Sequence, residues 1–498
     1  MTGIQLPRRK ILLGAGVAFF ASPWLRPLRA DEVALPPDAV RFRPEIEPLV
    51  RLLEETPREK LFREIALLIR QGTNYSELLA ATLLAGIRNV QPRPDVGFKF
   101  HCVMVIHAAH QATLAARDEH RWFPLFWSMD YFKRCQEQDR AEGEWTMRQV
   151  NRGDLTKEKA FKQLQESLEK WDVEKADAAA AVAAETVSST QLLDLFARYG
   201  ARDFRNIGHK AIWVAGAFRT LEAIGWEHAE PVMRSLAYAL LNHNGEPNPS
   251  ENDLPADRSG RANQERARRL PSSDLTAASD EELVKEWIQA ARVESPDGLA
   301  ELTMTALHRK ASSRSIFDAI QCSAAEMVMR QPAIVPLHAI TSTNAFHYLY
   351  RSVSEEGLRR WLILQNASFI GHFRDAAGKR ATLNEANLLE LQPAEQAIKE
   401  TSQIFEHLST DRKLASQAIL GYLKAGGDET ALLRHSRELI FLKGTDSHDY
   451  KYSSAIFEEY KYCSPRWRSE LLAAGSHLLT SSNEPDNGLK ERIAEAFS

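Results

Sequence analysis

Fifteen histidines are the side chains of this 498-residue sequence best suited to chemistry. Several lie inside stretches that are otherwise apolar, where a polar ring needs a hydrogen-bond partner or a ligand. Four such segments contain His101, His209, His338 and His448. Imidazole is a common ligand of transition metals and also exchanges protons near neutral pH. Any one of these histidines alone is typical of a hydrogen-bonded core residue, so a metal site depends on the set acting together.

The first segment carries three histidines, His101, His107 and His110. Residues three apart share one face of a helix, so His107 and His110 project together. His101 lies well away from that face, and the three rings could not easily bind one ion. His107 and His110 are therefore alternatives to His101 as ligands.

The last segment places His448 three residues before Lys451, so that both project from one face of a helix. One of residues 445–447 could cap the start of that helix. Asp446 or Asp449 could also hold the imidazole of His448 from its far side, as carboxylates do for metal-bound histidines.

The order and the local sequence of the four segments resemble those of the questin oxidase-like family. The matching segments are Phe100-His101, Gly208-His209-Lys210-Ala211-Ile212, His338-Ala339-Ile340-Thr341-Ser342 and Asp446-Ser447-His448-Asp449-Tyr450-Lys451. The third and fourth segments are the most specific, and the resemblance spans about residues 75–480.

That resemblance implies an all-helical, oxygenase-type oxidoreductase, because the family includes enzymes that cleave anthraquinones oxidatively. It implies a non-haem iron (Fe2+) held by His101, His209, His338 and His448 and by a carboxylated Lys451. Neutral imidazoles suit Fe(II), and a carbamate oxygen adds charge that stabilises higher oxidation states. Because CO2 adds only to a neutral amine, the lysine would need a site that lowers its pKa. The substrates would be O2 and an aromatic or quinoid small molecule, with an electron donor as a further partner.

The sequence departs from the family at Trp213, where many relatives carry a second histidine. It also contains no nicotinamide-binding motif, because the Gly14-x-Gly16 pair lacks a third glycine and a βαβ context.

Two other functions stay open at this point. A metal-dependent hydrolase could use a carbamylated lysine to bridge two ions, but it needs further carboxylates, and only Asp446 and Asp449 lie beside these histidines. Alternatively, the chain is a non-catalytic helical binding protein whose histidines are core groups.

The elements that must position these residues are helices. Apolar residues recur at three- and four-residue steps through most of the chain, which predicts an all-α fold of roughly fifteen to twenty helices in a large array around a buried metal site. Residues 244–273 are almost free of apolar side chains and predict a polar loop or linker. The alanine-rich stretch 166–187 predicts one or two exposed helices.

The N-terminus has the pattern of an export signal. Arg8 and Arg9 precede an apolar run, Ile11–Ala21, that is too short to span a bilayer comfortably, and a cleavage point follows Ala30. We therefore predict a twin-arginine signal peptide at 1–30, a periplasmic location, and one large helical domain at 31–498 without stable membrane insertion after cleavage. This route carries folded proteins and is often used when a cofactor is inserted first.

Composition excludes several classes of protein. Residues 1–30 hold five basic and no acidic residues, so the rest of the chain carries 58 basic against 67 acidic residues, a net charge of −9. Such a chain is a poor nucleic-acid binder. Its four cysteines form no CxxC pair, which argues against a zinc ribbon or a disulfide scaffold.

Overall fold

The computed structural model describes residues 36, 38–92, 99–241, 247–248, 251–271, 279–395, 398 and 400–498. The predicted signal peptide at 1–30 lies outside the described residues. Residues Ala39–Ser498 form one compact unit. Within the described residues this unit is all-α, as the periodicity predicts, and its β-type pairing is limited to one isolated bridge between Ala39 and Arg148. None of its described helices has the length and apolar character needed to cross a membrane.

The described residues form twenty-three α-helices, more than the expected number, partly because some are short. The first group is α1 (Glu47–Glu55), α2 (Arg58–Arg70), α3 (Tyr75–Asn89), α4 (His101–Met104), α5 (Ile106–Ala115) and α6 (Phe123–Glu142). The second group is α7 (Lys157–Lys170), α8 (Val173–Thr186), α9 (Ser189–Gly200), α10 (His209–Ile224), α11 (Ala229–Leu240) and α12 (Pro255–Arg268).

The second half of the chain continues the same architecture. Its helices are α13 (Glu281–Ala291), α14 (Pro296–His308), α15 (Ser313–Arg330), α16 (Ile334–Ser352), α17 (Glu356–Arg380) and α18 (Thr401–Thr410). The C-terminal group is α19 (Arg412–Lys424), α20 (Glu429–Lys443), α21 (Ser447–Tyr462), α22 (Arg468–Gly475) and α23 (Leu489–Phe497).

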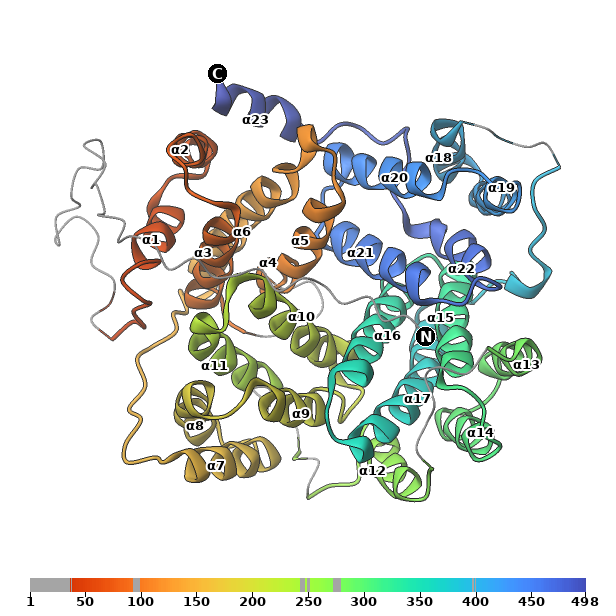
Figure 1. Cartoon of the computed structure of the whole chain (residues 1–498), viewed down its shortest axis with the longest axis horizontal. Helices are drawn as coiled ribbons and strands as arrows, with labels where there is room; N and C mark the ends of the chain where they lie inside the picture. The colour runs from red at the N-terminus through yellow and green to blue at the C-terminus, as the bar shows by residue number, and fades with distance from the viewer. Residues whose placement is uncertain are drawn as a thin grey trace, which may run out of the picture. The chain divides into compact units, whose positions relative to one another are not determined.

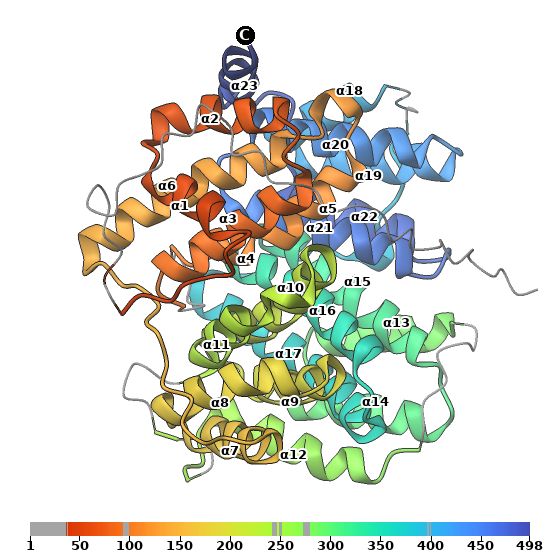
Figure 2. The same ribbon diagram turned by 60° about the vertical axis from the view of Figure 1, so that its left-hand side comes forward.

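Helix α16 lies at the centre of this array, and it packs against α10, α15, α17 and α21 (Figure 1). Every residue from Val335 to His347 is buried, so the helix has no solvent face. A stretch of helix that is buried on all sides belongs in a core, although this one includes polar residues such as His338 and His347. Figure 2 shows the same arrangement from a second direction, with α10, α16 and α17 crossing the middle of the unit. The core helix α16 is the one that carries His338.

The predicted polar loop or linker at 244–273 is wrong over much of its length, because α12 occupies Pro255–Arg268. This helix contacts α14 and α17, and most of its buried residues are polar. The amide of Asn263 is fully buried and donates to Gln365 Oε1 at 2.8 Å and to Ser368 Oγ at 2.9 Å. A search for apolar periodicity misses a helix held in this way.

The alanine-rich stretch is also more buried than predicted. Ala176 and residues 179–184 of α8 are all buried, and α8 packs against α7 and α11. Alanine is a good helix former with a small side chain, so it suits a face where two helix backbones approach each other.

Candidate metal centre

Four histidines from four distant parts of the chain meet in the core. His101 begins α4, His209 begins α10, His338 lies in the first turns of α16, and His448 lies in the first turn of α21. The ring centroids of successive pairs are 5.0 Å apart for His101 and His209, 4.5 Å for His209 and His338, 5.2 Å for His338 and His448, and 4.8 Å for His448 and His101. The four imidazoles therefore form a closed ring around a common centre.

The Nε2 atoms point toward that centre. The Nε2 of His209 lies 2.9 Å from the Nε2 of His101 and 3.1 Å from the Nε2 of His338. One ring nitrogen each of His101, His209 and His448 lies within 4.8 Å of the others. Two nitrogens that bind one ion at about 2.1 Å lie about 3.0 Å apart at a right angle and about 3.4 Å apart in a tetrahedron. The two observed distances are therefore short enough for the nitrogens of each pair to bind one ion.

In His209, His338 and His448, the other ring nitrogen, Nδ1, lies within hydrogen-bonding distance of an oxygen acceptor. The Nδ1 of His209 lies 2.6 Å from the carbonyl oxygen of Asn206, and that of His338 lies 2.7 Å from the carbonyl oxygen of Ile334. The Nδ1 of His448 lies 2.6 Å from Oδ1 of Asp446. Since each acceptor requires a hydrogen on Nδ1, the Nε2 atoms of these three neutral rings carry lone pairs.

This assignment leaves two lone pairs facing each other. His209 and His338 place their Nε2 atoms 3.1 Å apart, and neither ring has a hydrogen to share there. Burial lowers the pKa of both rings well below the usual value, so a second proton does not resolve the conflict. The Nε2 of His448 is buried and has no hydrogen-bond partner among the described residues. A cation at the centre would satisfy all of these nitrogens at once.

Lys451 completes the cluster from α21. The side chain is 6% exposed, and its Nζ has no hydrogen-bond partner in the described part of the chain. Burial lowers the pKa of this lysine to about 7. Its amine is therefore substantially neutral near pH 7, unlike that of an ordinary lysine.

The position of His209 depends on an unusual backbone turn. Asn206, Ile207 and Gly208 have φ values of 53°, 43° and 82°, and α10 starts directly afterwards. A side-chain Cβ on Gly208 would lie 2.5 Å from Oγ of Ser342, so the turn presses against α16. The same turn brings the Asn206 carbonyl to the Nδ1 of His209. The loop thus fixes both the place and the tautomer of the imidazole.

The position of His101 is fixed by the two residues before it. Lys99 forms ion pairs with Asp139 at 2.9 Å and with Glu142 at 2.6 Å. Phe100 packs edge-on against Trp213 of α10, with ring centroids 5.5 Å apart. The indole of Trp213 therefore has a packing role next to the site, at the position where the family resemblance led us to expect a second histidine.

The two aspartates of the α21 segment have different roles. Asp446 accepts from both the backbone N–H and the Nδ1 of His448. Burial would raise the pKa of Asp446, but the hydrogen bonds from His448 outweigh it and lower the pKa to about 2. Asp449 instead accepts from the backbone N–H groups of Thr445 and Asp446, which caps the helix. Asp446 therefore holds the imidazole, whereas Asp449 does not.

The alternative ligands His107 and His110 lie outside the cluster. The guanidinium of Arg219 approaches Nε2 of His107 at 3.4 Å, and Tyr75 hydrogen-bonds Nδ1 of His110 at 3.1 Å. Of the three histidines in this segment, His101 is the one brought to the centre.

Sequence reasoning missed the two backbone carbonyls, of Asn206 and Ile334, that set the tautomers of His209 and His338. Nothing in a side-chain pattern marks such acceptors. The nearest sequence signal is the Asn206-Ile207-Gly208 turn, since asparagine and glycine tolerate positive φ.

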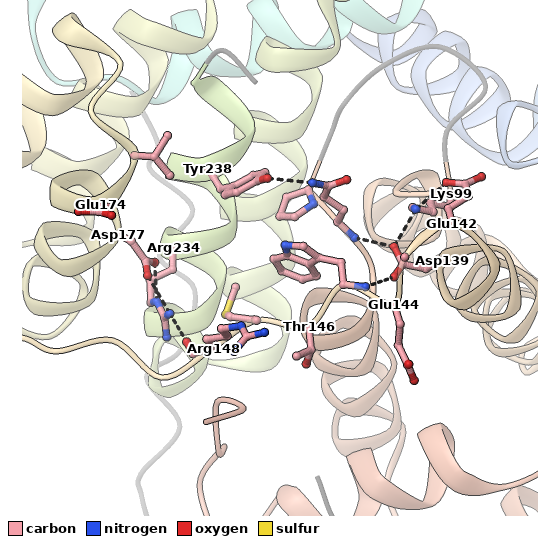
Figure 3. A pocket seen from close by; sticks show the side chains of 16 residues that line it. Lys99, Asp139, Glu142, Glu144, Thr146, Arg148, Glu174, Asp177, Arg234 and Tyr238 are labelled. Atoms are coloured by element: carbon pink, nitrogen blue, oxygen red, sulfur yellow. Dashed lines mark hydrogen bonds and ion pairs between the residues drawn. The ribbon is translucent and has the colours of Figure 1, made fainter. Parts of the chain in front are cut away.

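A surface cleft of about 510 Å³ near α6 and α11 is a weaker candidate (Figure 3). Its charged groups are largely paired with one another: Lys99 with Asp139 and Glu142, and Arg234 with Asp177 at 2.7 Å. Such pairs explain the polarity of the cleft without a ligand.

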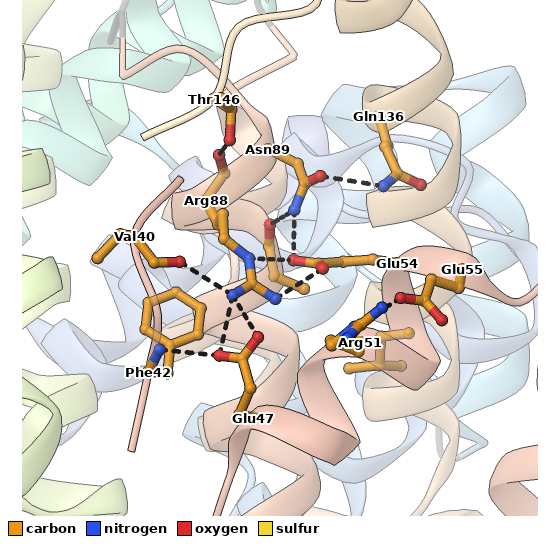
Figure 4. Close-up of polar contacts among 12 residues, drawn as sticks. Val40, Phe42, Glu47, Arg51, Glu54, Glu55, Arg88, Asn89, Gln136 and Thr146 are labelled. Atoms are coloured by element: carbon orange, nitrogen blue, oxygen red, sulfur yellow. Dashed lines mark hydrogen bonds and ion pairs between the residues drawn. The ribbon is translucent and has the colours of Figure 1, made fainter. Parts of the chain in front are cut away.

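Another buried charge cluster, around Arg88, is also structural (Figure 4). The fully buried guanidinium donates to Glu54 at 2.7 and 2.8 Å and to Glu47 at 2.7 Å. These bonds join α3 to α1 and leave both carboxylates occupied. Unlike these two charge clusters, the four-histidine cluster leaves buried polar atoms, Nε2 of His448 and Nζ of Lys451, without hydrogen-bond partners among the described residues.

Comparisons of the chain with models of protein families, with curated proteins and with solved structures find no match.

Proposed function

We propose that this chain is an exported non-haem iron oxidoreductase of the oxygenase type. It would use O2 to oxidise an aromatic or quinoid small molecule, as the resemblance to the questin oxidase-like family implies. The observation that carries the proposal is the pair of unprotonated Nε2 atoms of His209 and His338, held 3.1 Å apart by the hydrogen bonds on their far sides.

The donor set is compatible with iron. Neutral imidazoles suit Fe(II), and Nε2 spacings of 2.9 and 3.1 Å let neighbouring rings bind one ion. When bound, iron would supply the activation of O2 that side chains alone lack.

Lys451 would add an anionic oxygen ligand. Its buried, neutral amine attacks the carbon of CO2, a new N–C bond forms, and a proton is released to leave a carbamate. The carbamate balances part of the metal's charge in a cluster whose other members are neutral. Asp446 keeps the His448 ring oriented and its Nε2 unprotonated.

The hydrolase alternative has less support. A lysine carbamate that bridges two ions needs further carboxylate ligands, and the cluster of metal-ligating groups in the described residues contains histidines only. Asp446 is occupied by His448, and Asp449 by the helix cap.

Elemental analysis of protein expressed in the cytoplasm tests the proposal, with H338A, H448A and K451A as site variants. We expect about one iron per chain in the wild type, lost in H338A and H448A and reduced in K451A. His107→Ala is the matched control, because this half-buried histidine lies outside the cluster. Two zinc ions per chain would favour the hydrolase. A wild type that contains no metal would contradict both enzyme functions and favour the non-catalytic binding protein.

A further inference from the structure

A separate cavity of about 470 Å³ lies between α5, α20 and α21. Its size falls in the range of small-molecule sites. Tyr450 and Ser453 of α21 line it, and they follow His448 by two and five residues, which places them on the opposite side of the helix. None of the five proposed metal-site residues lines this cavity. It is therefore a different site from the metal centre.

The cavity holds an arginine without a counter-ion. Arg437 is half-buried, and the described residues give its guanidinium no hydrogen bond and no ion pair. Its contact is with the face of Phe457, 4.7 Å from guanidinium carbon to ring centroid. Burial lowers the pKa of Arg437 to about 10, yet the group stays charged near neutral pH. A partly buried cation without a counter-ion is stabilised by an anion that enters beside it.

The other charges of the cavity lead to the same conclusion. Glu458 is the carboxylate in its lining, but it is already bound by Arg219 at 3.0 Å and by Asn344 at 2.7 Å. Lys461 adds a second positive charge. The cavity is thus complementary to an anion.

Its remaining lining suits an aromatic body. Leu114 and Tyr462 are 65% and 39% exposed, and they are two of the four large apolar side chains exposed in the described residues. The rings of Phe441 and Tyr450 are nearly parallel, with centroids 6.2 Å apart, and both line the cavity.

We propose that this cavity binds an aromatic carboxylate. The carboxylate pairs with the guanidinium of Arg437, and the ring lies among Phe441, Leu114 and Tyr462. An arginine fork matches the two oxygens of a carboxylate, and a carboxylate supplies the counter-ion that the described residues do not give Arg437.

Isothermal titration of the purified protein with 2-naphthoate and its uncharged analogue 2-naphthamide tests the proposal. We expect naphthoate to bind and naphthamide to bind at least about tenfold more weakly, since it lacks the charge. Arg437→Gln should weaken naphthoate binding to a similar degree. Arg434→Gln is the matched control, because Arg434 lies on the same helix outside the cavity lining.

His338→Ala separates this site from the metal centre, where a carboxylate could also bind. Naphthoate binding that survives H338A but not R437Q supports the proposal. Equal affinities for naphthoate and naphthamide, an unchanged affinity in R437Q, or no naphthoate binding by the wild type would overturn it. The comparison of the two ligands on the wild type holds even if a variant fails to fold.

Discussion

At the scale of single residues, hydrogen bonds on the far side of each ring decide what the imidazoles can do. A histidine that donates from Nδ1 must present a lone pair at Nε2. His209 and His338 use backbone carbonyls for this purpose, whereas His448 uses the carboxylate of Asp446. The carboxylate is the one of these acceptors that a substitution can change directly.

Asp446→Asn should therefore weaken metal binding about 10- to 100-fold, because the amide is a weaker acceptor and can present its NH2 to Nδ1. Competition with a coloured chelator measures this affinity. Asp449→Asn is the matched control, since Asp449 caps the same helix without touching the ring. It should cost about 1 kcal/mol of stability and leave metal affinity nearly unchanged. Equal metal loss in both variants would show that the helix start matters rather than the His448 contact.

A histidine away from the site should make stability depend on pH. His477 is buried, hydrogen-bonds Ser416 at 2.7 Å, and has its pKa lowered to about 4, mainly by burial. Between pH 6.5 and 4 the unfolded chain binds a proton here that the folded chain does not, so stability falls as pH falls through this window. The wild type should lose about 3 kcal/mol more than His477→Gln over that range. Urea denaturation at several pH values measures the difference, and parallel pH profiles would contradict the prediction.

At the scale of elements, the helices could be predicted from the sequence and their docking could not. Apolar periodicity marks core helices such as α16 and predicts the all-α class. It misses α12, whose Asn263 docks by hydrogen bonds, and it treats α8 as exposed although its alanines are buried. The histidine segments could be found from their apolar surroundings and grouped by the family resemblance, but the turn at 206–208 that orients His209 depends on packing against Ser342. Such close contacts between distant segments leave no periodic signal.

Gly208→Ala should destabilise the protein by about 2–4 kcal/mol, because it adds both strain at positive φ and a clash with Ser342. It should also lower the metal content, since the turn positions His209. Gly488→Ala is a matched control: its φ of 72° is similar to the 82° of Gly208, but a Cβ there meets nothing within 4 Å. Thermal denaturation and metal analysis of both variants measure the two effects. Equal destabilisation by both would mean that the contact with Ser342 is unimportant.

At the scale of the whole compact unit, the site joins segments from position 101 to position 448. Helices α4, α10, α16 and α21 each supply one imidazole, and they pack directly or through neighbours in one core. One ion bound by this cluster would therefore connect four helices from distant parts of the unit Ala39–Ser498.

Metal binding should consequently stabilise the unit as a whole. An ion present at a hundred times its dissociation constant adds about 2.7 kcal/mol to the free energy of unfolding if it binds the folded state alone. Calorimetry of metal-depleted protein, with and without Fe2+ under anaerobic conditions, should show the main transition moving upward by a few degrees as one peak. His338→Ala should abolish the shift, and His107→Ala should retain it. If Fe2+ moved only a minor part of the transition, the four helices would unfold separately and the site would not form the centre of a cooperative core.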